Sequence, residues 1–208
     1  MLRNIDRAST PGFLRAHRAR WKARLAGWIL ARTGWRVTGA FPRERRLVIV
    51  AAPHTSNWDF VIAVLVMYAY DLRINWLGKH SLFRWPLGPL MRVLGGVAVN
   101  RQRADGVAVQ VAERMSDADH MWLIITPEGT RKAVSRWKSG FLRIAAAAEC
   151  PLLLVSLDYS HRELKLGEEI TVSPHLASDA DELEAQLAAI QHYYRRYTPR
   201  YPEHFRTE

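Results

Sequence analysis

Three uninterrupted apolar runs constrain the fold of this chain most strongly. They cover residues 47–52, 121–126 and 152–158. A strand with one face in water alternates apolar and polar residues, whereas a strand covered on both faces reads as a continuous hydrophobic run. The three runs therefore predict central strands of a sheet that carries helices on both sides.

Segments with helical periodicity separate these runs, and weaker strand candidates accompany them. The expected helices cover residues 59–70, 86–94, 105–115 and 139–149, with a last one after a capping box at Ser178 and Asp181. The weaker strands are 35–41, 73–77, 97–99 and 168–172. Strands that alternate with helices are typical of an α/β sheet. We therefore predict one α/β domain with a largely parallel or mixed central sheet flanked by helices, which suits 208 residues of 49% hydrophobic composition.

The first 46 residues carry the entire positive excess of the chain. They hold 12 Lys and Arg against 2 Asp and Glu, while residues 47–208 hold 18 of each, so the net charge of +10 arises at the N-terminus. Residues 13–32 have a helical pattern with one apolar stripe and basic neighbours. The stripe is Leu14, Trp21, Leu25 and Trp28, and the basic neighbours are Arg15, Arg18, Lys22 and Arg24. We predict a basic amphipathic segment over 1–46 and the α/β domain over 47–208.

Three interpretations of this basic helix stay open. Basic residues beside a Trp/Leu face suit an anionic membrane surface, because long cationic side chains reach up to lipid headgroups. The helix could also pack on the core with a solvated basic side, or form a nucleic-acid arm. We expect the membrane and no nucleic acid as the partner.

Membrane spanning and secretion find no support in the sequence. The start, residues 1–11, lacks the apolar segment of a secretory signal. The longest uncharged apolar helix candidate, residues 60–70, is about half of the ~20 residues that cross a bilayer. Cys150 is the only cysteine, so an internal disulfide and a zinc site of cysteine pairs are excluded, and a reducing compartment fits.

A histidine and an aspartate follow the first central strand. His54 and Asp59 are five residues apart, and on one continuous helix their side chains would point about 140° apart. Pro53 ends the strand, and Ser56 and Asn57 are good N-caps, so a strand, a turn and a helix from near residue 58 are expected. That bend can bring Asp59 under His54. A carboxylate there fixes the imidazole tautomer and leaves the second ring nitrogen free to take a proton. A capping aspartate beside an unrelated surface histidine is the other interpretation.

The second central strand ends in Pro127-Glu128-Gly129-Thr130-Arg131. Ligands of open α/β sheets bind at the carboxyl ends of the strands, so this turn and His54 face one crevice if their strands are parallel. Gly129 allows a close approach of the backbone, and the Arg131 guanidinium suits phosphate. Lys79 and Arg101 follow two other strands and would add positive charge, although each of these basic residues taken singly is usually a solvated surface charge.

Four blocks of the sequence resemble the glycerolipid acyltransferases, in the order found in that family. They are His54-x-x-x-x-Asp59, residues 78–101 ending in Val-Asn-Arg, the turn 127–131, and the proline-led strand 151–158. The resemblance covers roughly residues 45–160 and is strongest to bacterial 1-acyl-glycerol-3-phosphate (lysophosphatidic acid) acyltransferases. It implies an α/β enzyme that acts at the cytoplasmic face of the inner membrane as a peripheral protein.

The resemblance also implies the reaction and its residues. An acyl group passes from acyl-CoA or acyl-carrier protein to the free hydroxyl of a lysophospholipid, with His54 as the general base and Asp59 as its orienting partner. No enzyme nucleophile, metal or cofactor is expected, and no Gly-x-Ser-x-Gly elbow is present. By the same resemblance the acceptor and phosphate site comprises Arg101, Glu128, Gly129, Thr130 and Arg131, with Lys79 as a further member. Residues 60–70 and 86–94 would wall the acyl chain.

The first and third blocks depart from the common pattern. Thr-Ser-Asn-Trp separates the histidine from the aspartate, and Lys132-Ala133-Val134 follows the third block. Lyso-ornithine lipid and other lysolipids therefore remain alternative acceptors. A basic binding module with a structural His54–Asp59 pair is the alternative of another class. A metal hydrolase is weaker still, since no further His or carboxylate stands at ligand spacing from this pair.

Overall fold

The structure of the chain is a computed structural model that describes residues 4–99 and 106–205. Seven strands form one sheet: β1 (Arg36–Thr38), β2 (Arg46–Ala52), β3 (Asn75–Lys79), β4 (Gly96–Val99), β5 (Met121–Ile125), β6 (Leu152–Asp158) and β7 (Glu163–Ile170). The α-helices are α1 (Arg20–Arg32), α2 (Asn57–Ala69), α3 (Gly88–Val93), α4 (Gly106–Ser116), α5 (Gly140–Ala147) and α6 (Ala180–Tyr194).

The sheet is mixed, and its centre is parallel. The strand order is β1-β7-β6-β2-β5-β3-β4. Strand β2 pairs in parallel with β5 on one side and β6 on the other, and the parallel run continues through β3 and β4. Strand β7 is antiparallel to β6 and parallel to the edge strand β1. The three longest apolar runs of the sequence are thus three adjacent central strands, as predicted.

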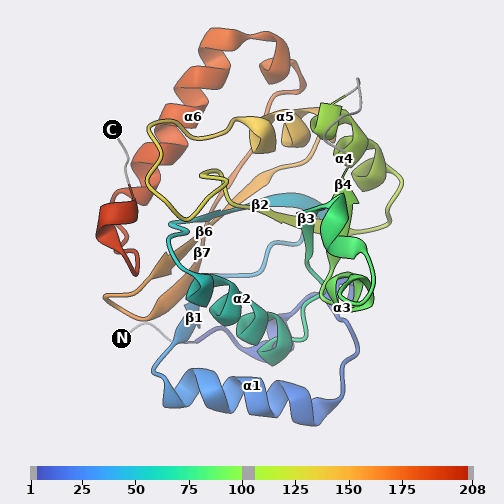
Figure 1. Cartoon of the computed structure of the whole chain (residues 1–208), viewed down its shortest axis with the longest axis vertical. Helices are drawn as coiled ribbons and strands as arrows, with labels where there is room; N and C mark the ends of the chain where they lie inside the picture. The colour runs from blue at the N-terminus through green and yellow to red at the C-terminus, as the bar shows by residue number, and fades with distance from the viewer. Residues whose placement is uncertain (1–3, 100–105, 206–208) are drawn as a thin grey trace.

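Each central strand contributes side chains to two separate cores. Val48 and Val50 of β2 belong to a cluster with α4, α5 and α6, while Leu47 and Ile49 belong to a second cluster with α1 and α2. Figure 1 shows the corresponding layers, with α5 and α6 on one side of the sheet and α1 and α2 on the other. The uninterrupted apolar composition of β2 follows from this double cover.

Most predicted elements are confirmed within a few residues, and the clearest differences lie at the edges. Strand β7 starts at Glu163, five residues before the predicted 168–172, because its first half pairs with β6 after a tight turn. The last helix is capped by Asp179, whose carboxylate accepts from the N–H groups of Asp181 and Glu182. The predicted cap Ser178 is wrong, since its hydroxyl donates to the carbonyl of His175 instead.

The N-terminal helix is shorter than its periodicity predicts. It begins at Arg20, and Leu14 lies in a separate 3-10 turn over Gly12–Leu14, where it is fully buried. Leu14 is therefore not part of the exposed stripe. Trp21, Leu25 and Trp28 remain together on α1 with 62%, 49% and 61% of their surface exposed. The helix thus presents an apolar face to solvent while its opposite face packs against α2.

Elements on both sides of the predicted boundary at residue 46 pack together. Strand β1 lies in the same sheet as the remaining strands, and α1 packs on α2. Arg18, one of the predicted basic neighbours of the stripe, contacts the domain: its guanidinium donates to the carbonyl of Leu72 at 2.9 Å and pairs with Asp71. Within residues 4–99 and 106–205, no helix has the length and apolarity needed to cross a membrane.

Candidate active site

Three neighbouring parallel strands end at the same edge of the sheet. His54 follows β2, Glu128 follows β5, and Tyr159 follows β6 directly. Because the strands are adjacent and run the same way, the residues after them lie close together. Hydrogen bonds to His54 and Asp59 link all three strand ends.

The turn after β2 is held by its own polar groups. Ser56 is the N-cap of α2, its hydroxyl accepts from the N–H of Trp58, and Ser56 and Asp59 form a capping box. One oxygen of Asp59, Oδ2, accepts from the N–H groups of Thr55 and Ser56, both at 2.9 Å. The capping role and the catalytic interpretation of Asp59 are therefore compatible, since the same carboxylate serves both.

The same oxygen faces the ring of His54. His54 Nδ1 lies 3.1 Å from Asp59 Oδ2, and only 4% of Asp59 is exposed. The His54 side chain is 21% exposed, so its ring borders solvent. Because Nδ1 is engaged with Asp59, Nε2 is the nitrogen left to accept a proton. The structure brings together the two residues that the sequence predicts as base and orienting partner.

Glu128 lies behind His54 and holds its backbone. Both carboxylate oxygens accept from the N–H of His54 at 3.0 Å, and the residue is 4% exposed. Burial raises the pKa of Glu128 to about 8; the His54 N–H opposes this shift, and the negative charge of Asp59 adds to it. The structure thus places Glu128 against the backbone of His54. Its part in the acceptor site stays a prediction.

The rest of the turn lies at the rim. Arg131 is exposed, and its guanidinium donates to the side-chain oxygen of Asn57 in the first turn of α2. Gly129 has a φ of +66°, a conformation that glycine adopts without strain. Thr130 is exposed, and its hydroxyl accepts from the N–H of Lys132 at 3.4 Å. Arg131 is thereby anchored beside the helix that carries Asp59.

The structure says less about Lys79 and Arg101, the other two cations predicted for the acceptor site. Lys79 ends β3, where it pairs in register with Val99 of β4. These strands are farther along the sheet from β2, beyond β5. Arg101 lies outside the described residues. Their part in an acceptor site stays a prediction.

Tyr159 is a site residue that the sequence-based reasoning missed. Its hydroxyl donates to Asp59 Oδ1 at 2.5 Å, and its ring packs edge-on against Trp35. Its position directly after the third apolar run is the signal in the sequence, because His54 and Glu128 follow the other two runs in the same way.

The C-terminal segment also reaches the turn after β2. The N–H of Tyr201 donates to the hydroxyl of Thr55 at 3.2 Å. The guanidinium of Arg200 lies 5.4 Å from the ring centre of Trp58 and 5.9 Å from that of Tyr159. No sequence motif marks these residues, since the contact depends on where the chain returns after α6.

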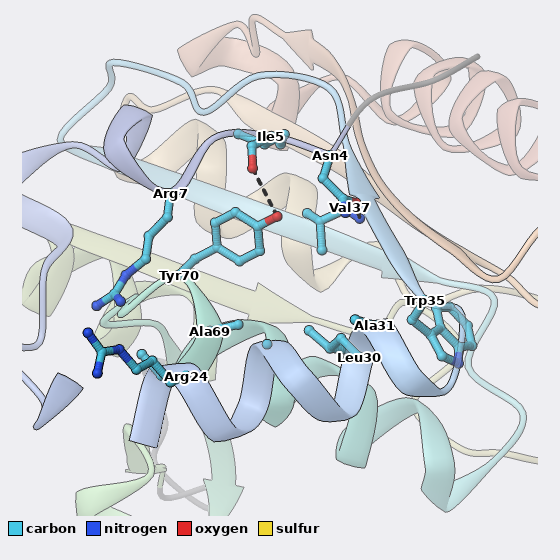
Figure 2. Close-up of a pocket in the computed structure, with 12 residues that line it drawn as sticks. Asn4, Ile5, Arg7, Arg24, Leu30, Ala31, Trp35, Val37, Ala69 and Tyr70 are labelled. Carbon is cyan, nitrogen blue, oxygen red and sulfur yellow. Dashed lines mark hydrogen bonds between the residues drawn. The ribbon is translucent and has the colours of Figure 1, made fainter. Parts of the chain in front are cut away.

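A separate cavity of about 380 Å³ lies between α1, the N-terminal segment and the end of α2. Figure 2 shows Arg7 and Arg24 at one end of it and Trp35 at the other, with Leu30 and Ala31 between them. Ala69 and Tyr70, from the predicted acyl-chain wall 60–70, also line it. That wall is only partly buried, since Phe60 and Val61 are 47% and 40% exposed.

Metal ligation is not favoured by the described part of the chain. No group of three or more His, Cys, Asp or Glu side chains within residues 4–99 and 106–205 is arranged to hold a metal ion. Cys150 is buried, and burial raises the pKa of its thiol to about 11, so the thiolate is disfavoured. The site instead provides a histidine base, His54, whose backbone is held by Glu128 and whose ring is held by Asp59.

Comparisons with known proteins identify the family and the fold. A family model described as Acyltransferase matches residues 34–158. The crystal structure of the 1-acyl-sn-glycerophosphate (LPA) acyltransferase PlsC from Thermotoga maritima is similar, with a TM-score of 0.57 and 19% sequence identity. That match covers 86% of this chain and 81% of the other, which confirms the predicted fold class. No curated protein sequence matches this chain.

Proposed function

Because the chain belongs to the acyltransferase family, matched over residues 34–158, we propose that it moves a fatty acyl group from acyl-CoA or acyl-carrier protein to a lysophospholipid. The proposed acceptor is 1-acyl-glycerol-3-phosphate. The observation that carries the proposal is the His54–Asp59 pair, 3.1 Å apart, at the strand edge that also holds Arg131. A resident cofactor or metal is not part of it.

The proposed reaction needs one base and no covalent intermediate with the enzyme. His54 Nε2 takes the proton of the acceptor hydroxyl as the oxygen attacks the thioester carbonyl carbon. A C–O bond forms, the tetrahedral intermediate collapses, the C–S bond breaks, and the thiolate receives the proton from His54. Asp59 stabilises the imidazolium between these two transfers, because its charge lies beside Nδ1.

The acceptor's phosphate is proposed to lie against Arg131. The guanidinium forms a planar fork that matches phosphate oxygens, and its bond to Asn57 fixes it beside the start of α2. Gly129 and Thr130 shape this rim, and Lys79 and Arg101 are further proposed contacts. Glu128 acts in the proposal by keeping the backbone of His54 in place.

The enzyme is proposed to work as a peripheral protein on an anionic membrane, at the cytoplasmic face of the inner membrane. A lysophospholipid acceptor is a membrane amphiphile, so a docking surface near the site favours its capture. The exposed Trp21, Leu25 and Trp28 of α1, among basic neighbours, support this placement.

The test is the turnover of 1-acyl-glycerol-3-phosphate by the His54→Ala variant with acyl-CoA and with acyl-carrier protein. We expect a loss of at least about 100-fold, as for a removed general base. His161→Ala is the matched control, because His161 forms another His–Asp contact, 2.9 Å from Asp158, on an exposed turn. Its turnover should equal that of the unaltered chain.

Near-normal turnover by a folded His54→Ala variant would remove this residue from the mechanism. Product analysis by mass spectrometry with a panel of lysolipids, lyso-ornithine lipid included, identifies the acceptor. Acylation of another lysolipid in preference to 1-acyl-glycerol-3-phosphate would replace the proposed acceptor and leave the proposed role of His54 intact.

A further inference from the structure

Asp59 has two carboxylate oxygens, and the protein uses them differently. Oδ2 accepts from His54 and from the backbone of Thr55 and Ser56. Oδ1 accepts from the hydroxyl of Tyr159 at 2.5 Å, a short bond that joins β6 to the start of α2. The Tyr159 residue lies just past the end of the family match at residue 158.

The Tyr159 hydroxyl is a reliable proton donor. Burial raises the pKa of Tyr159, and its bond to the Asp59 carboxylate raises it further, while Arg200 acts in the opposite direction. The phenol therefore stays protonated around neutral pH, so Asp59 receives a proton donor on the oxygen that faces away from His54.

We infer that Tyr159 is a positioning residue for the His54–Asp59 pair: its hydroxyl fixes the Asp59 carboxylate and withdraws charge from it, which sets the basicity of His54. The predicted effect of Tyr159 on turnover rests on the proposed function. The predicted effect on the His54 imidazole is independent of it. Tyr159 lies outside the four sequence blocks that resemble the family.

The sign of the effect follows from the charges. A carboxylate beside an imidazole favours the protonated ring and raises its pKa. A hydrogen bond to Oδ1 stabilises the carboxylate and weakens that influence. Without the Tyr159 hydroxyl, Asp59 presents more negative charge to His54, and the pKa of His54 rises. The base is then protonated over a wider pH range and oriented less firmly.

Other ionisable groups also face the pair. Glu128 reaches it from the end of β5, with a pKa raised by burial to about 8. Arg131 lies on the same turn as Glu128 and contacts Asn57 of α2. Arg200, on the C-terminal segment, stacks near Tyr159 itself. Phenylalanine keeps a ring for Arg200 but also removes the contact of Arg200 with the Tyr159 hydroxyl, so 3-fluorotyrosine, which keeps that hydroxyl, is the necessary second comparison.

The test is an NMR titration of the His54 imidazole in the whole chain, with its signal identified by its absence in His54→Ala. Tyr159→Phe should move the titration of the His54 ring to higher pH. Tyr197→Phe is the matched control, because it removes another buried tyrosine hydroxyl, which contacts Tyr193. The control should leave the titration of His54 unchanged.

A second substitution gives a result even if Tyr159→Phe folds poorly. Replacing Tyr159 by 3-fluorotyrosine keeps the ring and makes the hydroxyl a stronger donor, so the pKa of His54 should fall. Turnover supplies an independent reading: Tyr159→Phe should lower kcat about tenfold with little change in KM, as for a lost hydrogen bond to a charged group, and move the acid limb of kcat/KM to higher pH.

The inference is overturned if the His54 titration is the same with tyrosine, phenylalanine and 3-fluorotyrosine at position 159, or if Tyr197→Phe shifts it equally. An unaltered chain that acylates no lysolipid would end the proposed function, while the NMR shifts would still decide the role of Tyr159.

Discussion

At the residue scale, Glu128 shows how one buried carboxyl couples stability to pH. Its oxygens accept the N–H of His54 whether the group is neutral or charged, but burial disfavours the charge. The pKa of Glu128 is about 8 in the folded chain against an ordinary value of 4.5. Folding therefore takes up a proton between these two values, and this contribution makes stability fall as the pH rises from 4.5 to about 8.

Glu128→Gln should remove that dependence, because the amide keeps a carbonyl acceptor for His54 and carries no charge. We expect the free energy of unfolding of the unaltered chain to fall, relative to the variant, by a few kcal/mol between about pH 5 and about pH 8. Urea unfolding of both proteins at the two pH values measures the difference. Parallel pH profiles would show that Glu128 titrates normally.

Also at this scale, the sequence predicted the contact between His54 and Asp59 but not the network around it. The five-residue spacing, Pro53 and the cap Ser56 are local features, and they determine the bend. The bonds from Tyr159 and Tyr201 to this turn join residues 100 and 146 positions apart. Contacts of that kind depend on strand order and on the return of the chain, which local patterns do not contain.

At the element scale, the central strands were predictable and the ends of several helices were not. Strands β2, β5 and β6 are covered on both faces, so their composition alone identified them. Helix α1 begins later than its periodicity indicates, because Leu14 turns into the core and the N–H of Ala16 donates to the carbonyl of Asp71. Tertiary packing thus interrupts a pattern that is continuous in the sequence.

Gly27 gives α1 a testable weak point. It lies inside the helix and borders the cavity of Figure 2, and a Cβ built on it meets nothing within 4 Å. Gly27→Ala should therefore stabilise the protein by about 0.5–1 kcal/mol, since alanine restricts the unfolded chain and favours helix. Thermal unfolding should show a rise in Tm of about 1–4 °C.

Gly39→Ala is the opposite control for this prediction. Its φ is +99°, and an added Cβ would lie 2.0 Å from the carbonyl oxygen of Leu166, so this variant should unfold more easily. A Gly27→Ala variant that also loses stability would mean that the open space beside α1 closes in solution.

At the scale of the whole molecule, charge and exposed aromatic surface coincide. The net charge of +10 comes from the first 46 residues, and α1 within that segment exposes Trp21 and Trp28. Figure 1 shows α1 as the outermost layer beneath α2, the helix that begins at the active-site turn. A membrane bound through α1 would therefore lie on the same side of the sheet as Asp59.

We predict that the whole chain binds vesicles of phosphatidylcholine with phosphatidylglycerol, by two separable contributions. Attraction of the basic segment to anionic lipid weakens as salt screens it, while insertion of the tryptophan rings does not. Trp21→Ser with Trp28→Ser should lower the binding constant about 10- to 100-fold and abolish the binding that remains at high salt.

Val109→Ser is the control, because Val109 is an exposed apolar residue on α4, whose buried face packs in the core on the other side of the sheet. Co-sedimentation across a salt series, beside a DNA pulldown, gives the answer. Retention on DNA with a steep salt dependence and no vesicle binding would instead identify the basic segment as a nucleic-acid arm, since counterion release governs such binding.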